Sequence, residues 1–414
     1  MIPDYTRPLL EGGSPRKLLV IVNPIGGKGK GEAIFHELLK PMLEGAGTSY
    51  EMIVTTGPMH AEKIAEALDL KLIGAICVVG GDGLFGEILN GLNRRPLDRM
   101  AALSLPIGIV PAGSSNCLAC SVGLRQPLAA AFSIARGVTK PLDTLKVTLD
   151  NNKVILSVCG VSYGFISEVN THAGKWRWLF GPARYSVCGL RTVLGSPLKY
   201  HVDCRFQPPS LEDSPEVDTT ECGPDCMVCM KNQRRPSDDP SIPKSPDRTY
   251  VGSFILGGSS THSSEDVPET WIESSVMMGP RRKSLSRATS DPSTMLLFSI
   301  TNLSIRQSQN KTVWNPYCHM ASGHMDLVLM PVMSRIQLLK FFAKFSKTKH
   351  IDKKNDAVFS VIKAKSVEMK LTKDNFEALP QWERGIQIAI DGEVYPLQPL
   401  RVDTLHGLLN LMLS

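Results

Sequence analysis

The chain has 414 residues, of which 42% are hydrophobic and 21% are charged. At about 150 residues per domain, this length predicts two or three domains with cores that need no disulfides. Lys and Arg number 46 against 40 Asp and Glu, which leaves a formal charge of +6. That excess is too small over this length to indicate nucleic acid as the main partner, although clustered basic residues would suit an anionic membrane surface.

The sequence contains no run of about 18 or more apolar residues, so we expect no transmembrane helix. The first 15 residues, a predicted tail, lack the apolar stretch of a signal peptide. Ten cysteines are present, and Cys77 and Cys159 lie inside apolar stretches. This usage predicts reduced thiols rather than a disulfide framework, and therefore an intracellular, soluble protein.

Residues 16–142 predict an α/β domain. Apolar strand patterns alternate with helical patterns, and the strands are apolar throughout, which indicates a parallel sheet covered on both faces. Glycines concentrate directly after the strands, at the edge where open α/β sheets bind ligands. The expected strands are residues 17–23, 50–55, 73–80 and 107–110.

A second domain follows, in which strands succeed one another without intervening helices. This pattern indicates an antiparallel β-sandwich, which we assign to residues 143–206 and 294–414. A helical piece at about 167–194 interrupts it. Residues 207–293 are rich in Pro, Ser, Asp and Glu and predict a disordered insert.

Three glycine-containing loops follow three of the predicted parallel strands: residues 23–31 (NPIGGKGKG), 80–83 (GGDG) and 111–116 (PAGSSN). Glycines let backbone N–H groups approach phosphate oxygens. The first loop does not fit the P-loop pattern, because no Gly-Lys precedes Ser or Thr. Each loop alone is explained as well by a turn, and Asp82 alone by a helix N-cap. Together, at neighbouring strand ends, they predict a phosphate-handling site.

In order and spacing, these motifs resemble the catalytic domain of the diacylglycerol, sphingosine and ceramide lipid kinases. The resemblance covers residues 16–198 and resumes at 294. Within this family three local features are similar to the ceramide kinases: a Trp- and Arg-containing segment at 175–192, a C-x3-C-x2-C motif at 222–229, and a basic amphipathic segment at 334–349. Animal ceramide kinases usually begin with a pleckstrin-homology domain, and we expect no counterpart of it in this sequence, which affects the expected membrane targeting and not the chemistry.

The resemblance implies transfer of the γ-phosphate of ATP to the primary hydroxyl of ceramide, giving ceramide 1-phosphate. Sphingosine is the second candidate substrate and diacylglycerol the third; a catalytically silent, lipid-binding scaffold is the alternative from another class, disfavoured by the intact Asp82. The resemblance also implies that Mg²⁺ is the cofactor, that Ca²⁺ acts as a regulator, and that the protein is cytoplasmic and peripherally associated with membranes. A carboxylate beside the lipid hydroxyl can take its proton as the P–O bond forms, so we predict Asp82 as the general base.

The family's other site residues are carried over position by position. The predicted substrate-binding residues are Gly80, Gly81, Asp82, Gly83 and Glu168. The predicted ATP-binding residues are Asn23, Pro24, Ile25, Gly26, Gly27, Thr55, Thr56, Gly57, Pro58, Met59, Glu87, Gly113, Ser114, Ser115, Arg177, Arg184, Asp391, Gly392 and Glu393. The alternative for Asp391 and Gly392 is a plain hairpin turn, and for the two arginines a place on the surface beside tryptophans.

The three closely spaced cysteines and the segment 334–349 each have more than one interpretation. Cys222, Cys226 and Cys229 are one ligand short of a tetrahedral zinc site, which Cys204 or a histidine would have to complete; the trio is otherwise redox-responsive, palmitoylated or incidental. We assign no metal ligands from the sequence.

The segment 334–349 is either a membrane-binding or calmodulin-binding helix, or a helix that packs its apolar stripe on the sandwich. The stripe consists of Leu338, Phe341, Phe342 and Phe345.

Overall fold

The first part of the chain builds a parallel sheet because its strands are apolar on both faces. Strand β3 is buried along its whole length, and it lies between β4 and β1, with β2 outside β1. All three pairings are parallel. The strands are β1 (Lys17–Val22), β2 (Tyr50–Val54), β3 (Ile73–Gly80) and β4 (Pro106–Pro111).

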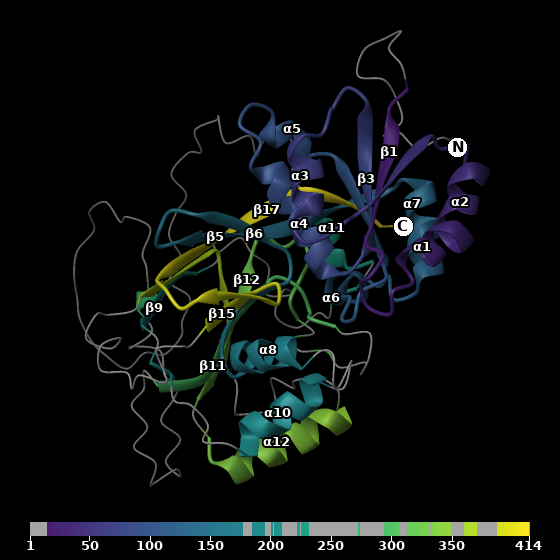
Figure 1. Ribbon diagram of the computed structural model, residues 1–414. Helices are drawn as coiled ribbons and strands as arrows, with labels where there is room; N and C mark the ends of the chain where they lie inside the picture. Colours follow the sequence, from purple (N-terminus) through teal and green to yellow (C-terminus); the bar gives the residue numbers. More distant parts are fainter. Residues whose placement is uncertain are drawn as a thin grey trace, which may run out of the picture.

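Helices cover both faces of this parallel sheet. Figure 1 shows α3, α4 and α5 on one side of the strands and α2 and α7 on the other. A π-helical turn, η2 (Phe35–Leu39), joins α1 to α2 in one continuous helical segment. The helices are α1 (Gly31–Ile34), α2 (Lys40–Gly45), α3 (His60–Glu66), α4 (Asp82–Asn93), α5 (Arg99–Leu103), α6 (Cys117–Ser121) and α7 (Pro127–Arg136).

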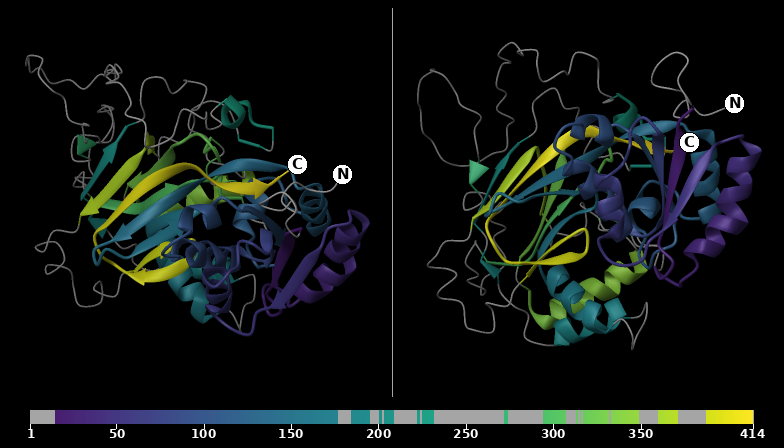
Figure 2. Two further views of the ribbon diagram at one scale, coloured as in Figure 1. Left: turned by 90° about the horizontal axis from the view of Figure 1, so that it is seen from above. Right: turned by 45° about the horizontal axis from the view of Figure 1, so that its top comes forward.

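The sheet does not end with the first domain. Strand β17 (Leu400–Met412) pairs in parallel with β4 at one end and antiparallel with β5 (Thr139–Leu149) along its length, so that a single ten-stranded sheet spans both halves of the molecule. Figure 2 shows β17, in yellow, running between the two halves. The remaining strands of this sheet are β6 (Val154–Ser157), β9 (Asp203–Gln207), β10 (Ile272–Glu273) and β14 (Ser366–Lys370).

A second, seven-stranded sheet is antiparallel throughout and runs β13-β12-β11-β7-β15-β16, with β8 paired to β11. Its strands are β7 (Gly160–Gly164), β8 (Tyr200–His201), β11 (Thr294–Thr301), β12 (Met325–Pro331), β13 (Ser360–Ala364), β15 (Gln387–Ile390) and β16 (Glu393–Pro396). The helices of this half are α8 (Phe165–Lys175), α10 (Arg184–Leu194), α11 (Met227–Lys231) and α12 (Arg335–Thr348).

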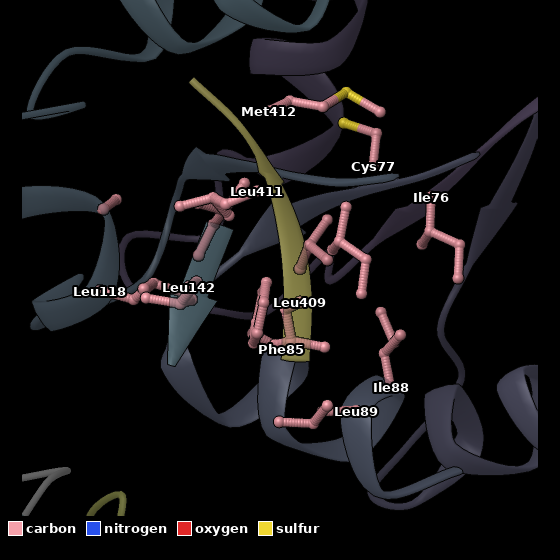
Figure 3. Packing of buried hydrophobic residues seen from close by; sticks show 14 of the residues in the cluster. Ile76, Cys77, Phe85, Ile88, Leu89, Leu118, Leu142, Leu409, Leu411 and Met412 are labelled. Atoms are coloured by element: carbon pink, nitrogen blue, oxygen red, sulfur yellow. The ribbon is translucent and has the colours of Figure 1, made fainter. Parts of the chain in front are cut away.

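Two hydrophobic cores result. The first surrounds the parallel strands and includes Phe85 of α4 and Leu411 of β17, which Figure 3 shows among their neighbours. The second lies between the two sheets and includes Val147 of β5 and Leu327 of β12. The predicted fold class, a parallel α/β domain followed by an antiparallel sandwich, is confirmed.

The computed structural model describes residues 15–176, 184–194, 200–201, 203–208, 222–223, 225–231, 272–273, 294–306, 313, 315, 317–331, 333–348, 360–370 and 387–413. Most of the insert predicted to be disordered lies outside these residues, but Met227–Lys231 forms α11, with Val228 and Cys229 buried. In the described part of the chain, none of the helices is both long and apolar enough to cross a bilayer.

The strand pattern predicts that all of residues 294–414 belong to the second domain, whereas the end of β17 packs in the first core. Asn410 and Leu411 pair with β4, and Leu409, Leu411 and Met412 are buried in the first core. The C-terminal strand therefore holds the two halves of the molecule together.

Replacing Leu411 with alanine tests this role. The side chain is buried in the first core, so we expect Leu411→Ala to lower the free energy of unfolding by about 2–5 kcal/mol through lost burial and the remaining cavity. Chemical denaturation monitored by circular dichroism measures the change. Leu97, which is 96% exposed, is the matched control, and Leu97→Ala should change stability by less than about 0.5 kcal/mol. Equal effects of the two substitutions would contradict the anchoring role of β17.

Candidate active site

The first glycine loop is shaped by Asn23, which directly follows β1. Its Oδ1 accepts hydrogen bonds from the amides of Ile25 (3.0 Å) and Gly26 (2.9 Å), a turn that Asn favours. Gly27 has a φ of +57°, and a Cβ there would lie 2.4 Å from the carbonyl oxygen of Ala112. This position therefore needs glycine, both for its backbone conformation and for its contact with the third loop.

The second and third loops touch each other. A Cβ on Gly81 would meet the Cα of Gly113 at 3.0 Å, and a Cβ on Gly113 would meet the Cα of Gly81 at 2.5 Å. Asn116, with a φ of +53°, accepts a hydrogen bond from the Gly113 amide (2.8 Å) on its Oδ1 and holds the third loop closed. The structure thus brings the three predicted loops together at one edge of the sheet.

Asp82 lies where these loops meet. It is the first residue of α4 and follows the N-cap residue Gly81. Its Oδ1 and Oδ2 accept hydrogen bonds from the amides of Leu118 and Cys117, each at 2.9 Å, at the start of α6. A carboxylate has about four acceptor positions, so these bonds orient Asp82 and leave it able to accept a proton.

The electrostatics of Asp82 suit a proton acceptor. Burial raises the pKa of its carboxyl group, the amides of Leu118 and Cys117 oppose this, and the neighbouring Asp391 raises the pKa further. The net direction is upward from the ordinary value. A carboxylate with a raised pKa holds a transferred proton more readily than an ordinary one, which is the property that a general base requires.

Glu87, one turn further along α4, faces the segment at the end of β2. Burial raises the pKa of this carboxyl group; the amides of Met59 and Ala61 at the start of α3 lower it, and Glu393 raises it. Among the described residues its buried Oε2 has no hydrogen-bond partner. A buried polar atom of this kind costs free energy unless a ligand satisfies it, so Glu87 is suited to contact a bound nucleotide.

The segment that contains Thr55 and Thr56 is anchored to its surroundings. Thr55 is buried, and its amide (2.8 Å) and hydroxyl (3.3 Å) both donate to the carbonyl oxygen of Val22. The Thr56 amide donates to Nδ1 of His60 at 3.1 Å. The amide of His60 in turn donates to the carbonyl oxygen of Gly57 at 3.4 Å. The segment continues through Pro58 to Met59, the exposed residue before α3 with a φ of +61°.

The Asp391-Gly392-Glu393 motif is a hairpin turn between β15 and β16, as the simpler interpretation predicts. Asp391 also accepts four hydrogen bonds. One comes from the Ser157 hydroxyl (2.6 Å), and three come from the backbone amides of residues 158–160 (2.9 Å each). Burial raises the pKa of its carboxyl group. Asp391 thereby fixes the hairpin to the connection between β6 and β7.

The same hairpin returns to the glycine loops. A Cβ on Gly83 would lie 3.7 Å from Oε1 of Glu393, and Glu393 and Asp391 raise the pKa of Glu87 and Asp82, respectively. Carboxylates from both halves of the chain therefore face one another across this site. In the described residues, no three of these acids lie close enough to form a cation site by themselves.

This arrangement fits Mg²⁺ held jointly with a nucleotide. Mg²⁺ usually binds one or two carboxylates and completes its octahedral shell with water and phosphate oxygens. Glu87, with its unpartnered buried Oε2, and Glu393, beside the GGDG loop, have the oxygen donors that such an ion requires. Mg²⁺ held by these residues would supply charge neutralisation for bound phosphates.

Arg177, Arg184 and Glu168 come after the first domain in the sequence, whereas Gly80 belongs to the GGDG loop itself. Arg177 lies outside the described residues, and of Arg184 the structure describes only its place as the first residue of α10. Glu168 lies in the first turn of α8, a helix that packs on β15 and β16. Gly80 ends β3, and its carbonyl oxygen accepts a hydrogen bond from the Ala112 amide at 2.8 Å.

Other predicted loop residues lie at the surface of the site. Ile25 is 76% exposed, and Pro24, Ser114 and Ser115 are half-buried on the first and third loops. Gly57, Gly83 and Gly392 lie in open turns or at a helix start, and only Gly83 has a neighbour within 4 Å of an added Cβ.

Two residues outside the predicted set position the site. Asn116 holds the third loop, as described above. Asn90 of α4 accepts a hydrogen bond from the Leu156 amide (2.9 Å) and donates to the Leu156 carbonyl oxygen (3.0 Å), which fixes α4 to β6. An asparagine that closes a small-residue turn before a helix is a recognisable signal, but nothing local to Asn90 indicates its partner 66 residues away.

Comparisons with known proteins agree with this geometry. Residues 17–147 match the model of the diacylglycerol kinase catalytic domain. The chain is 33% identical over 290 residues to sphingoid long-chain bases kinase 1 of Arabidopsis thaliana, covering 67% of this chain and 37% of that one. It is 28% identical over 342 residues to ceramide kinase of Homo sapiens, covering 80% and 57%, and 38% identical over 191 residues to sphingosine kinase 2 of Homo sapiens, covering 44% and 28%.

The chain thus spans less than two thirds of the length of these relatives. A solved structure of a diacylglycerol kinase from Bacillus anthracis superposes with a TM-score of 0.53 over 96% of this chain and 97% of the other, at 15% identity, a similarity of fold. These matches support the lipid kinase family and leave the substrate undetermined among ceramide, sphingosine and other sphingoid bases.

The contact between the first and third loops is testable at Gly27. We expect Gly27→Ala to weaken nucleotide binding by about tenfold or more, because the new Cβ collides with the backbone at Ala112 and disfavours the positive φ. Isothermal titration calorimetry with ATP and Mg²⁺ measures the affinity. Gly45→Ala, where an added Cβ meets nothing within 4 Å, is the control. Equal affinities for the two variants would exclude this loop as part of the nucleotide site.

Proposed function

We propose that this chain is an ATP-dependent lipid kinase that phosphorylates the primary hydroxyl of a sphingolipid, with ceramide as its first substrate. The observation that carries the proposal is the convergence of three glycine loops on one oriented carboxylate, Asp82. Phosphoryl transfer needs donors that hold the phosphates and a group that takes the proton of the attacking hydroxyl. The amides of the loops and the Asp82 carboxylate are suited to these two roles.

Asp82 takes the proton that is released in the proposed phosphoryl transfer. The lipid hydroxyl gives its proton to the carboxylate as its oxygen attacks the γ-phosphorus of ATP. The bond from that phosphorus to the bridging oxygen breaks, and ADP leaves with the electron pair. The two hydrogen bonds from backbone amides of α6 hold the carboxylate in one orientation during this transfer. This fixed orientation avoids reorganisation of the site as the charge moves.

Nucleotide binding is assigned to the glycine loops, to Glu87 and to the Asp391-Gly392-Glu393 hairpin, whose Glu393 lies beside the GGDG loop. The loops that begin at Asn23 and Gly113 hold phosphates through their backbone amides, and Glu87 contacts the nucleotide or its ion. Arg177 and Arg184 remain part of the proposal as phosphate clamps, because guanidinium groups bind phosphate oxygens as a planar fork.

Ceramide is favoured over sphingosine by the extent of similarity. Of the three relatives above, the ceramide kinase matches the largest share of this chain, 80% against 67% and 44%. The three cysteines of the C-x3-C-x2-C motif that resembles ceramide kinases are buried. Sphingosine remains the alternative, because the sphingosine kinase relative has the higher identity over a shorter length.

Docking on a membrane from the cytoplasmic side is part of the proposal. Helices α10 and α12 lie beside each other (Figure 1) and contact one another. Leu190 and Leu194 of α10 and Ile336 and Leu339 of α12 are exposed, which suits insertion between lipid headgroups. Glu168 is proposed near the acceptor headgroup.

Calmodulin binding at 334–349 remains a prediction. The packing of α12 against the protein opposes such binding. Leu338 is fully buried and Phe341 is 6% exposed, as the alternative of a helix packed on the protein predicts. Calmodulin would have to compete with these contacts for the same apolar side chains. Regulation by Ca²⁺ through calmodulin requires that calmodulin displace α12 from these contacts.

Activity of purified protein tests the function. With ATP and Mg²⁺ in mixed micelles, we expect phosphorylation of ceramide first, sphingosine second and diacylglycerol third. Asp82→Asn should reduce turnover by at least about 10²-fold, the contribution typical of a general base, without loss of the folded state by circular dichroism. An unchanged rate would remove Asp82 from this role, and a folded protein inactive on every lipid would favour a lipid-binding scaffold.

The raised pKa of Asp82 predicts a pH dependence. The base works only when ionised, so kcat/KM for the lipid should fall as pH decreases through the pKa of Asp82. Because burial raises that pKa, the fall should occur above the ordinary value of about 3.9. Initial rates at saturating ATP over a pH series measure it. Persistence of the same acidic limb in the residual activity of Asp82→Asn would assign the limb to another group.

A further inference from the structure

Four metal-binding side chains come together outside the candidate active site. Cys222, Cys226 and Cys229 from the insert meet His319, which lies between β11 and β12. All four are buried, and their ligand atoms lie within 4.8 Å of one another. From the sequence the cysteine trio is one ligand short of a tetrahedral site, with Cys204 or a histidine as the candidate fourth ligand; in the structure His319 lies at this place.

The spacing of these atoms matches the edges of a small tetrahedron. A tetrahedral ion with Zn–S bonds of about 2.3 Å has its ligands about 3.8 Å apart. The Sγ atoms of Cys222 and Cys229 are 3.8 Å apart, and Nδ1 of His319 lies 3.9 Å from Sγ of Cys229 and 3.2 Å from Sγ of Cys226. None of these cysteines is in a disulfide. The four groups surround one point rather than pairing off.

We propose that Cys222, Cys226, Cys229 and His319 bind one Zn²⁺ ion in a closed structural site. Three thiolates and one imidazole favour zinc over Mg²⁺ or Ca²⁺, which prefer oxygen ligands. With four protein ligands and no position left for water, the site is of the structural kind. The imidazole binds through Nδ1, the nitrogen that faces the sulfurs.

The site joins two segments that are distant in sequence, the cysteine segment of the insert and the stretch around His319. The cysteines pack in the first core together with Met320 and Ala321, and the carbonyl oxygen of Met320 accepts a hydrogen bond from the Asp143 amide of β5 (2.7 Å). The ion would therefore fasten the cysteine segment of the insert to the junction between the two domains, where β5 pairs with β17.

Arg306 connects the cysteine segment to α6, the helix whose first amides hold Asp82. The guanidinium group of Arg306 donates to the carbonyl oxygen of Cys222 (3.4 Å), and its backbone amide donates to the hydroxyl of Ser121 at the end of α6 (3.0 Å). Zinc binding would thus support α6 through Arg306, at the end of the helix away from Asp82. Its loss should loosen this helix as well as the insert.

Metal analysis of the full-length protein, purified without chelator, tests the proposal. We expect about one zinc ion per chain by inductively coupled plasma mass spectrometry, and X-ray absorption with three sulfur ligands at about 2.3 Å and one nitrogen at about 2.0 Å. His319→Ala and Cys226→Ser should each lower zinc content and thermal stability. Cys204→Ala is the matched control: Cys204 is buried in the second core, and its removal should leave the zinc content unchanged.

Each outcome bears on the proposal directly. Folded wild-type protein that contains no zinc, and binds none when ZnCl₂ is added, would overturn it. Full zinc content in His319→Ala, or loss of zinc in folded Cys204→Ala, would overturn His319 as the fourth ligand. Because the absorption spectrum is recorded on the wild type, the test does not depend on the variants folding. No lipid or ATP is used, so the result is independent of the proposed kinase activity.

Discussion

The candidate site depends on close approach of backbone to backbone at the edge of the parallel sheet. Gly27 lies against Ala112, and Gly81 lies against Gly113, at separations that leave no room for a side chain. This contact places the start of α6 beside the start of α4, so that the Asp82 carboxylate reaches the amides of Cys117 and Leu118. The orientation of the proposed base follows from that contact.

The second constraint is the continuity of the large sheet across both halves of the molecule. Strand β17 pairs with β5 in the sandwich and with β4 in the parallel region, and the hairpin carrying Asp391 and Glu393 is held against the β6–β7 connection. Acids from the C-terminal part are thereby placed beside the GGDG loop. A site built from both halves depends on their relative position, and both β17 and the proposed zinc ion act on that position.

Asp82 shows how a structural and a chemical role coexist in one residue. Its two hydrogen bonds from backbone amides resemble those of a helix cap. The amides belong to the start of α6, whereas Asp82 itself begins α4. Burial raises the pKa, and the amides lower it. The balance leaves a carboxylate fixed in direction and disposed to take a proton, which a cap exposed to solvent would not be.

The parallel strands, the three loops at their ends and the antiparallel second half follow from the sequence alone, because apolar runs, strand alternation and glycine turns are local patterns. Strand β17 does not, since its residues are divided between two cores and its pattern matches neither environment throughout. Asn90 and Asp391 act through partners far along the chain, and so does His319 beside the three cysteines. Only the folded chain decides these contacts, because hydrogen bonds and metal ligands depend on distance in space, which residue spacing does not determine once the chain has turned back on itself.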